Sequence, residues 1–251
     1  MIVLTTTAPI ADKAVEVKTE KPAVRKKKKK IYLTFDDGPN RGTRNVLNIA
    51  TQEQVPITFF IIGEHAFASK TQELTWDSLT LAPDSLVELC NHSYTHAWHN
   101  RFNSFYQSPD SVVKDFERCR DSLQLKNNII RTPGRNTWRI DTIQFTDLKK
   151  SIAAVDSLQN AGFVVMGWDL EWHYDHSGLA LKNRSDDLLN QIDSLFKKGK
   201  TKSAEHLVLL AHDQVYEDAE DSCELHQFIK KIKLKPEYEL ELATRYPGTR
   251  Q

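Results

Sequence analysis

The sequence IYLTFDDGP at residues 31–39 joins an apolar run to two adjacent carboxylates and a Gly-Pro pair. The run from Ile31 to Phe35 is typical of a buried β-strand, and Gly38-Pro39 ends it. Asp36 and Asp37 should therefore lie at the carboxyl end of a buried strand and not in open solvent. Like charges this close resist joint ionisation unless a positive group lies beside them. We therefore expect a cationic or metal partner at this strand end.

A second motif, HSYTH at residues 92–96, places two histidines four residues apart. On one turn of helix His92 and His96 would share a face. With the carboxylate of Asp37 they make a set of one oxygen and two imidazole ligands. This set suits Zn²⁺ or another first-row divalent ion such as Co²⁺ or Ni²⁺ better than calcium or magnesium, and it leaves a position open, as catalysis requires. An exposed helix face is the alternative explanation of such a histidine pair.

Composition limits the classes of protein to consider. The chain has 251 residues, of which 39% are hydrophobic and 27% charged, enough for one domain with one core. The formal net charge is zero, which argues against a nucleic-acid partner. No apolar run approaches the ~20 residues of a membrane span, so we expect no transmembrane segment. The three cysteines lack C-x-x-C spacing and predict buried free thiols.

The amino-terminal segment differs in composition from the rest of the chain. Residues 11–30 are rich in Lys, Glu, Ala, Pro and Val, and a block of basic residues occupies positions 25–30. Such composition favours disorder. We expect residues 1–29 to form a disordered basic arm and residues 30–251 to form the functional domain. Attraction of the basic block to an anionic surface is the alternative to a solvated linker.

After residue 30, short apolar runs alternate with amphipathic stretches. We expect strands at 31–35, 57–62, 86–91, 129–131, 163–168 and 207–211, and helices at 43–54, 110–123, 146–161, 185–198 and 222–234. Strict alternation of strand and helix implies parallel pairing, so the expected fold is α/β with a closed or nearly closed barrel. In such barrels the catalytic residues come from the carboxyl ends of the strands.

Asp36 is the candidate for activating water, and Arg131 is a candidate for positioning such a carboxylate. If Asp37 is neutralised by a metal, its neighbour Asp36 can stay ionised and accept a proton from water. Arg131 ends another expected strand, and its guanidinium could hold a carboxylate in place and lower the carboxylate pKa.

A candidate proton donor follows the apolar run at 207–211. His212 is delivered by that run to the same barrel rim, where it could protonate a leaving group. In the segment WDLEWH at 168–173, Asp169 or Glu171 could orient His212. Trp168 and Trp172 could line a sugar-binding cleft, with packing inside the barrel as the competing explanation for Trp168.

Taken together, these motifs resemble those of the polysaccharide deacetylases, the family 4 carbohydrate esterases that carry the NodB homology domain. TFDDGP at 34–39 matches the first family motif residue for residue, and HSYTH matches the second. The resemblance covers about residues 30–235 and implies a distorted (β/α)7 barrel, similar to a TIM barrel. It also implies metal-dependent removal of acetyl groups from N- or O-acetylated polysaccharide, such as peptidoglycan or chitin-like glycans.

The resemblance implies roles for individual residues. By position, Asp36 corresponds to the general base, Asp37, His92 and His96 to the metal ligands, His212 to the general acid and Arg131 to the arginine that pairs with the base. The implied substrates suggest the cell envelope, the periplasm or the cell exterior, although the amino terminus shows no clear export signal.

The chain departs from the family pattern at its third and fourth motifs. Gly134 stands where the family usually has an aromatic residue, so the oxyanion-donating N–H is kept while the aromatic wall of the cleft is lost. Arg135, Trp138 and Arg139 follow it, and two arginines beside the cleft would favour a substrate that bears carboxylates. The alternative is that both arginines pair with acids such as Asp141 on a surface loop. We take Arg135 and Trp138 as candidate substrate-binding residues. Glu171 stands where the family usually has aspartate.

Two other functions compete with a polysaccharide deacetylase. One is a metal-dependent hydrolase of the C–N bond in a small amide, and the other is an inactive carbohydrate-binding relative. The Asp36-Asp37 pair argues against the first, and the presence of every candidate ligand and of the candidate base argues against the second.

Overall fold

The computed structural model describes residues 1–4 and 27–249. Most of the segment for which we expect a disordered arm, residues 1–29, lies outside the described residues, so that expectation stays a prediction. No helix in the described ranges is both long enough and apolar enough to cross a membrane.

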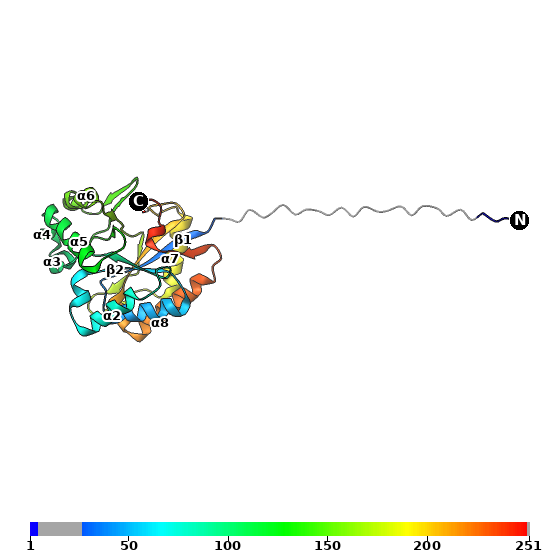
Figure 1. Cartoon of the computed structure of the whole chain (residues 1–251), viewed down its shortest axis with the longest axis horizontal. Helices are drawn as coiled ribbons and strands as arrows, with labels where there is room; N and C mark the ends of the chain where they lie inside the picture. The colour runs from blue at the N-terminus through cyan, green and yellow to red at the C-terminus, as the bar shows by residue number, and fades with distance from the viewer. Residues whose placement is uncertain (5–26, 250–251) are drawn as a thin grey trace.

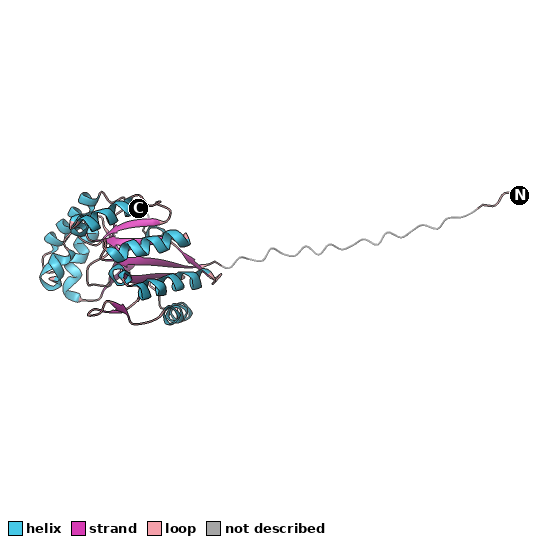
Figure 2. Cartoon of the chain, turned by 90° about the horizontal axis from the view of Figure 1, so that it is seen from below, coloured by secondary structure: helices cyan, strands magenta, loops and turns pink. Residues whose placement is uncertain are grey.

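A curved, mostly parallel sheet forms the centre of the fold, and helices are arranged around it (Figure 2). Its ten strands follow the order β6-β5-β7-β4-β3-β2-β1-β11-β8, with β12 also paired to β1. They are β1 (Lys29–Asp36), β2 (Ile57–Ile61), β3 (Val87–Asn91), β4 (Ile129–Ile130), β5 (Thr137–Ile140), β6 (Ile143–Thr146), β7 (Val164–Val165), β8 (Leu170–Glu171), β11 (His206–His212) and β12 (Tyr238–Leu240). A hairpin of β9 (Tyr174–Asp175) and β10 (Ala180–Leu181) lies apart from this sheet.

Parallel pairing makes the sheet an open α/β barrel. Strands β7, β4, β3, β2, β1, β11 and β8 pair in that order, each parallel to the next. In the described part of the chain no pairing joins β8 back to β7, so the barrel stays open between them. The predicted barrel-like α/β architecture is confirmed. Residues 166–169 connect these two strands without an intervening helix.

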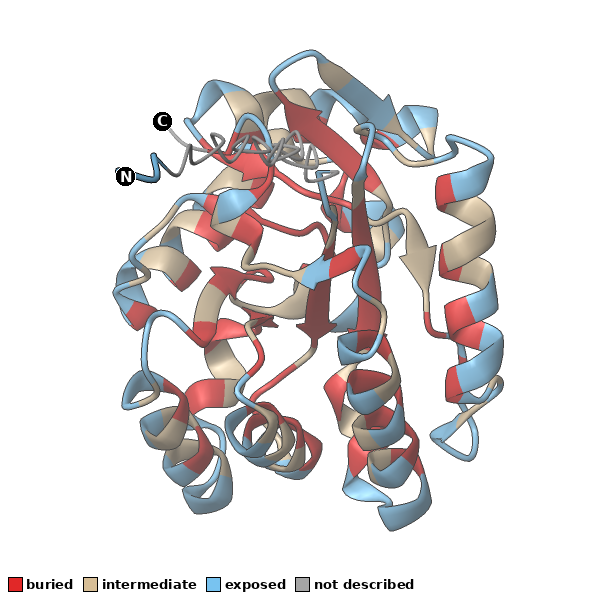
Figure 3. Ribbon diagram, turned by 90° about the vertical axis from the view of Figure 1, so that its right-hand side faces the viewer, coloured by how far each residue is buried: buried red, intermediate tan, exposed pale blue. Residues whose placement is uncertain are grey.

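Amphipathic helices cover the outside of the sheet, and buried residues are concentrated on the strands and on the inner sides of the helices (Figure 3). In Figure 1, α3–α6 gather on one side of the body, whereas α2 and α8 lie along its lower edge. The helices are α1 (Arg41–Glu53), α2 (Lys70–Thr80), α3 (His96–Asn100), α4 (Phe102–Phe105), α5 (Pro109–Leu123), α6 (Ile152–Asn160), α7 (Ser185–Lys197) and α8 (Ala219–Lys233). Asn40 caps α1 through a reciprocal capping box with Thr43, which fixes the chain just after the Asp36-Asp37 pair.

Most differences from the expected elements have a local physical cause. Residues 143–146 pair with β5 as a strand, so the helix expected at 146–161 begins at Ile152. The expected strand at 163–168 shortens to β7, because its last residues form the crossing between β7 and β8. Cys90 and Cys119 are free and buried as expected, whereas Cys223 is exposed on α8, contrary to the expectation of a buried thiol.

Candidate metal centre and catalytic cavity

A cavity of about 770 Å³ opens at the carboxyl ends of the barrel strands. Its lining brings together side chains from β1, β8, β9 and β11, from the short helices α3 and α4, and from loops that follow the strands, including the loop after β3. Most of the residues predicted from the sequence are among those that line it: Asp36, Asp37, His92, His96, Gly134, Trp168, Glu171 and His212.

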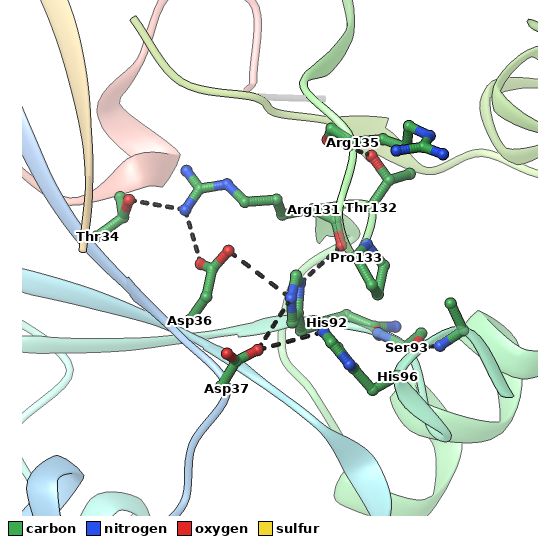
Figure 4. A network of polar contacts seen from close by, with 12 residues as sticks. Thr34, Asp36, Asp37, His92, Ser93, His96, Arg131, Thr132, Pro133 and Arg135 are labelled. Atoms are coloured by element: carbon green, nitrogen blue, oxygen red, sulfur yellow. Dashed lines mark hydrogen bonds and ion pairs between the residues drawn. The ribbon is translucent and has the colours of Figure 1, made fainter. Parts of the chain in front are cut away.

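Three of these residues converge on one point, as Figure 4 shows. The Nε2 atoms of His96 and His92 lie 3.3 and 3.5 Å from Oδ1 of Asp37. The three candidate ligand atoms lie within 4.8 Å of one another. Asp37 Oδ1 is buried and has no hydrogen-bond partner in the described part of the chain. A buried carboxylate oxygen without a partner, facing two imidazole nitrogens, fits a divalent metal ion.

Hydrogen bonds fix the orientation of both histidine rings. His92 Nδ1 lies 2.9 Å from the Arg131 carbonyl oxygen, and His96 Nδ1 lies 2.5 Å from Asn100 Oδ1. A neutral ring that donates its Nδ1–H to one of these oxygens keeps the lone pair of Nε2 for a metal ion. In metal sites, hydrogen bonds made by the ring nitrogen that does not bind the metal orient the histidine ligands.

Burial and the neighbouring charges shift the pKa values of all three residues. Burial lowers the pKa of His96 to about 4, which keeps its Nε2 free to bind a metal. Burial also acts to lower the pKa of His92, but Asp36 and Asp37 outweigh it and raise that pKa. For Asp37, the contact with His92 and the nearby imidazoles overcome burial and hold the carboxylate pKa well below its usual range.

The loop that carries the histidines differs from the expected helical turn. His92 ends an extended segment, and residues 96–100 form a left-handed turn with φ values from 48° to 67°. The prediction that His92 and His96 share one face of a right-handed helix is therefore wrong, although the two rings do meet. Left-handed backbone costs about 1–2 kcal/mol per residue for non-glycine residues, so other contacts must hold this turn.

Asp115 of α5 supplies such contacts. Its buried carboxylate accepts hydrogen bonds from the backbone N–H groups of Tyr94 and Thr95 and from the Thr95 hydroxyl, at 3.0–3.2 Å. Thr95 Oγ1 in turn accepts from the N–H of Trp98 at 2.9 Å. The turn is thus tied to α5 through one carboxylate that sequence reasoning did not single out.

Asp36 lies beside the candidate metal site and pairs with Arg131. Arg131 Nη1 donates to Asp36 Oδ1 at 2.7 Å, and Asp36 Oδ2 lies 3.7 Å from His92 Nε2. The guanidinium also donates to the carbonyl oxygens of Met166 and Gly167 at 3.2 and 3.0 Å. Arg131 therefore orients the candidate base and also bridges β4 to the open seam between β7 and β8.

His212 is the last residue of β11, where it pairs with Asp36 of the neighbouring strand β1, and its side chain lines the cavity. Its ring lies 5.1 Å from that of Tyr174, and its buried Nδ1 has no partner in the described residues. Asp169 accepts hydrogen bonds from the N–H groups of Lys202 and Val208 instead, at 2.7 and 2.8 Å. Its proposed role in orienting His212 is not supported by this position. Of the two alternatives, only Glu171 lines the cavity, where it lies 3.4 Å from His173 Nδ1.

Besides Arg131 and Asp169, four predicted or discussed side chains do not line the cavity. Trp138 is fully buried and donates to Asn136, and Trp172 is 1% exposed and donates to the Asn183 carbonyl at 2.8 Å. Their predicted contact with substrate is not supported, because both rings are enclosed by the core. Arg139 is buried in an ion pair with Asp156. Arg135 is itself absent from the cavity lining, but its guanidinium lies 6.0 Å from the ring centroid of Phe102, which lines the cavity. The expectation of two arginines beside the cleft is therefore wrong for Arg139, whereas Arg135 lies next to the cavity wall.

Sequence reasoning missed several residues of the cavity wall. Phe102 of α4 and Tyr174 of β9 both line it, as do the carboxylates of Glu64 and Asp147. Phe102, Asp147 and Tyr174 do not directly follow a predicted strand, so position in the expected barrel gave no signal for them. Glu64 is the second residue after the strand predicted at 57–62, and this position could have identified it. The cavity lining in the described residues contains no Lys or Arg.

Comparison with known proteins shows which family the chain is similar to. The family model described as Polysaccharide deacetylase matches residues 23–139, somewhat less than half of the chain. Over these residues the chain is similar to the polysaccharide deacetylases. Among curated relatives, the chitin disaccharide deacetylase of Vibrio alginolyticus is 24% identical over 80% of this chain and 66% of its own length. The putative polysaccharide deacetylase YheN of Bacillus subtilis is 29% identical over 74% of this chain and 58% of its own length. The chain thus spans less than two thirds of the length of both relatives.

Solved structures show the same fold. The catalytic domain of a peptidoglycan N-acetylglucosamine deacetylase from Eubacterium rectale has a TM-score of 0.61 at 22% identity, covering 88% of this chain and 91% of that one. A family 4 carbohydrate esterase from Streptomyces lividans has a TM-score of 0.59 at 18% identity, covering 87% and 94%. The distorted barrel expected for a polysaccharide deacetylase is confirmed by this likeness.

Proposed function

We propose that this protein is a metal-dependent hydrolase that removes acetyl groups from an acetylated polysaccharide. The observation that carries the proposal is the convergence of Asp37, His92 and His96 beside the buried Asp36–Arg131 pair in one cavity. A metal site next to a held carboxylate is the arrangement that hydrolysis of an amide or ester by water requires.

In this proposal Asp37, His92 and His96 hold the metal, with zinc as the expected ion. When bound, a divalent ion supplies Lewis acidity, which polarises the acetyl carbonyl and lowers the pKa of water in the site. Asp36, fixed by Arg131, accepts the proton of the attacking water. The N–H of Gly134, which donates to no group in residues 27–249, is free to stabilise the developing oxyanion. His212 protonates the departing nitrogen or oxygen, and acetate leaves.

The lining of the cavity supports a neutral glycan over an anionic one. Glu64, Asp147 and Glu171 contribute carboxylates, while no Lys or Arg of the described residues lines the cavity. A substrate rich in carboxylates would meet like charge there. We therefore propose a polymer of N-acetylglucosamine, chitin-like or from peptidoglycan with its acidic groups outside the cavity, as the substrate. Such glycans belong to cell walls, and we propose action at the cell envelope or outside the cell.

Acetate release from defined polymers tests the proposal. Zinc-loaded protein should release acetate from N-acetyl chitin oligomers, and acetylated xylan and peptidoglycan serve as comparisons. Release only from small amides would favour the C–N hydrolase alternative. Binding of the oligomer without any release by the zinc-loaded protein would favour an inactive carbohydrate-binding relative.

The role of His212 has its own test. His212→Ala should lower turnover on an N-acetyl oligomer more than on an aryl acetate, because an aryl oxide leaves without a proton. Equal losses on both substrates would assign His212 to another task.

A further inference from the structure

The ring of Phe102 forms the cavity wall next to His96. Phe102 begins α4 and lines the cavity. Its ring centroid lies 5.8 Å from that of His96, with the two planes 85° apart. An aromatic side chain therefore lies immediately beside a candidate metal ligand, on an element that carries no sequence motif.

A side chain at position 134 would occupy the space that the Phe102 ring fills. A Cβ atom added to Gly134 would lie 2.9–3.1 Å from three atoms of the Phe102 ring. The φ of Gly134 is +63°, a left-handed value that also disfavours a side chain. The absence of a side chain at 134 thus lets the Phe102 ring close over the Gly134 backbone. Phe102 therefore supplies the aromatic cavity wall that we expected to be lost at Gly134.

Three neighbours hold the ring in place before any ligand binds. His96 contacts it edge to face, Gly134 lies against it, and the Arg135 guanidinium lies 6.0 Å from its centroid. A ring held by its surroundings loses little conformational freedom when it binds a ligand.

We propose that Phe102 is a substrate-binding residue, on whose ring the sugar that carries the reacting acetyl group stacks. The proposal rests on the proposed function and specifies how that site recognises a pyranose. A pyranose presents an apolar C–H face that packs on an aromatic ring, while its hydroxyl and amide groups stay at the edge for polar partners. Carboxylates such as Asp147 line the same cavity and can accept hydrogen bonds from those hydroxyls.

Kinetics of zinc-loaded variants test the stacking role. Phe102→Ala should raise KM for N-acetyl chitotetraose about tenfold, because the apolar contact of the ring is lost. The loss of kcat/KM on a small aryl acetate, which has no pyranose to stack, should be clearly smaller than the loss on the oligomer. Phe102→Trp should keep the low KM, and Phe102→Leu, apolar but not flat, should not. Phe67→Ala is the matched control, since this Phe is 51% exposed and outside the cavity lining. Unchanged KM in a Phe102→Ala variant with a normal melting curve would overturn the proposal.

A double-mutant cycle tests whether a side chain at position 134 would overlap with the Phe102 ring. Gly134→Ala alone should impair glycan hydrolysis, and the same change in a Phe102→Ala background should cost less, because the ring no longer blocks the new methyl group. Additive losses would contradict the pairing of these two residues.

Binding separates this inference from the proposed function. Calorimetric titration of N-acetyl chitotetraose into zinc-loaded Asp36→Asn protein should give an affinity about tenfold higher than with Asp36→Asn/Phe102→Ala protein. If wild type hydrolyses no acetylated glycan but this difference in binding is found, the proposed reaction fails and the stacking role stands. If no oligomer binds, the stacking role fails as well.

Discussion

Arg131 Nη1 lies 2.7 Å from Asp36 Oδ1, and neither side chain is more than 3% exposed. This ion pair joins the carboxyl ends of two strands, since Asp36 ends β1 and Arg131 directly follows β4. The same guanidinium donates to the carbonyls of Met166 and Gly167, where the barrel is open. Removing it would therefore affect both stability and the orientation of the candidate base.

Arg131→Ala is expected to lower the free energy of unfolding by about 3–5 kcal/mol, because a buried carboxylate is left without its partner. Urea denaturation measures this loss. Arg41→Ala is the control, since its ion pair with Glu217 is exposed (72% and 56%) and is expected to contribute at most about 1 kcal/mol. Equal losses in the two variants would contradict the structural role of Arg131.

Asp36→Asn should separate catalysis from metal binding. We expect turnover to fall by at least about a hundredfold, as for loss of a positioned general base. Metal content should stay near that of wild type, because Asp36 is not among the three converging ligands. Asp37→Asn should lose both metal and activity, and elemental analysis with an acetate assay distinguishes the two. A fully active Asp36→Asn protein would show that the roles are assigned wrongly.

Asn100 should support metal binding through His96, whose Nδ1–H it accepts at 2.5 Å. Asn100→Gly removes this acceptor without backbone strain, since φ at this position is +67°. We expect zinc affinity to fall about 10- to 100-fold, as for loss of other groups that orient metal ligands. The rise in melting temperature on adding zinc measures affinity in each variant. The melting temperature of the metal-free protein is the control and should change little. Unchanged zinc affinity would show that His96 needs no such support.

Asp213 should make stability depend on pH. Burial raises the pKa of Asp213 from 3.8 to about 8, and its carboxylate is hydrogen-bonded to Thr43 and Asn40. The folded state therefore keeps a proton that the unfolded state releases, so this group lowers stability as pH rises from about 4 to about 8.

Asp213→Asn removes this titration. The melting temperature of the variant relative to wild type should therefore rise between pH 4.5 and pH 9, measured with chelator present so that metal binding does not contribute. Asp84→Asn, whose side chain is 76% exposed in wild type, is the control and should show no such trend. A constant difference between Asp213→Asn and wild type would mean that Asp213 is ionised in the folded protein.

The parts of the fold and site that the sequence predicted are those encoded locally. The apolar runs before Asp36 and His212 are long enough to identify β1 and β11, and both residues lie at the expected rim. The Asp37, His92 and His96 set followed from residue type and spacing, and the structure brings the three together.

What the sequence did not predict depends on contacts between distant segments. Phe102 reaches the cavity through the left-handed turn at 96–100, which is held by Asp115 from another helix. Asp169 and Glu171 are only two residues apart, and pairing of Asp169 with the Val208 N–H decides which of them faces the cavity. From the sequence alone, Trp138 could not be distinguished from an aromatic residue that lines a cleft. In the structure it lies on β5 with its side chain buried in the core.

The most direct test of the account measures acetate released from an N-acetyl chitin oligomer by the same preparation before and after removal of metal. Protein as purified should carry about one divalent ion per chain, as expected for one three-ligand site. Dialysis against a chelator should abolish acetate release, and zinc or cobalt should restore it in wild type but not in Asp37→Ala protein. Undiminished acetate release from metal-free protein would contradict the assignment of Asp37, His92 and His96 as the metal site on which this hydrolysis depends.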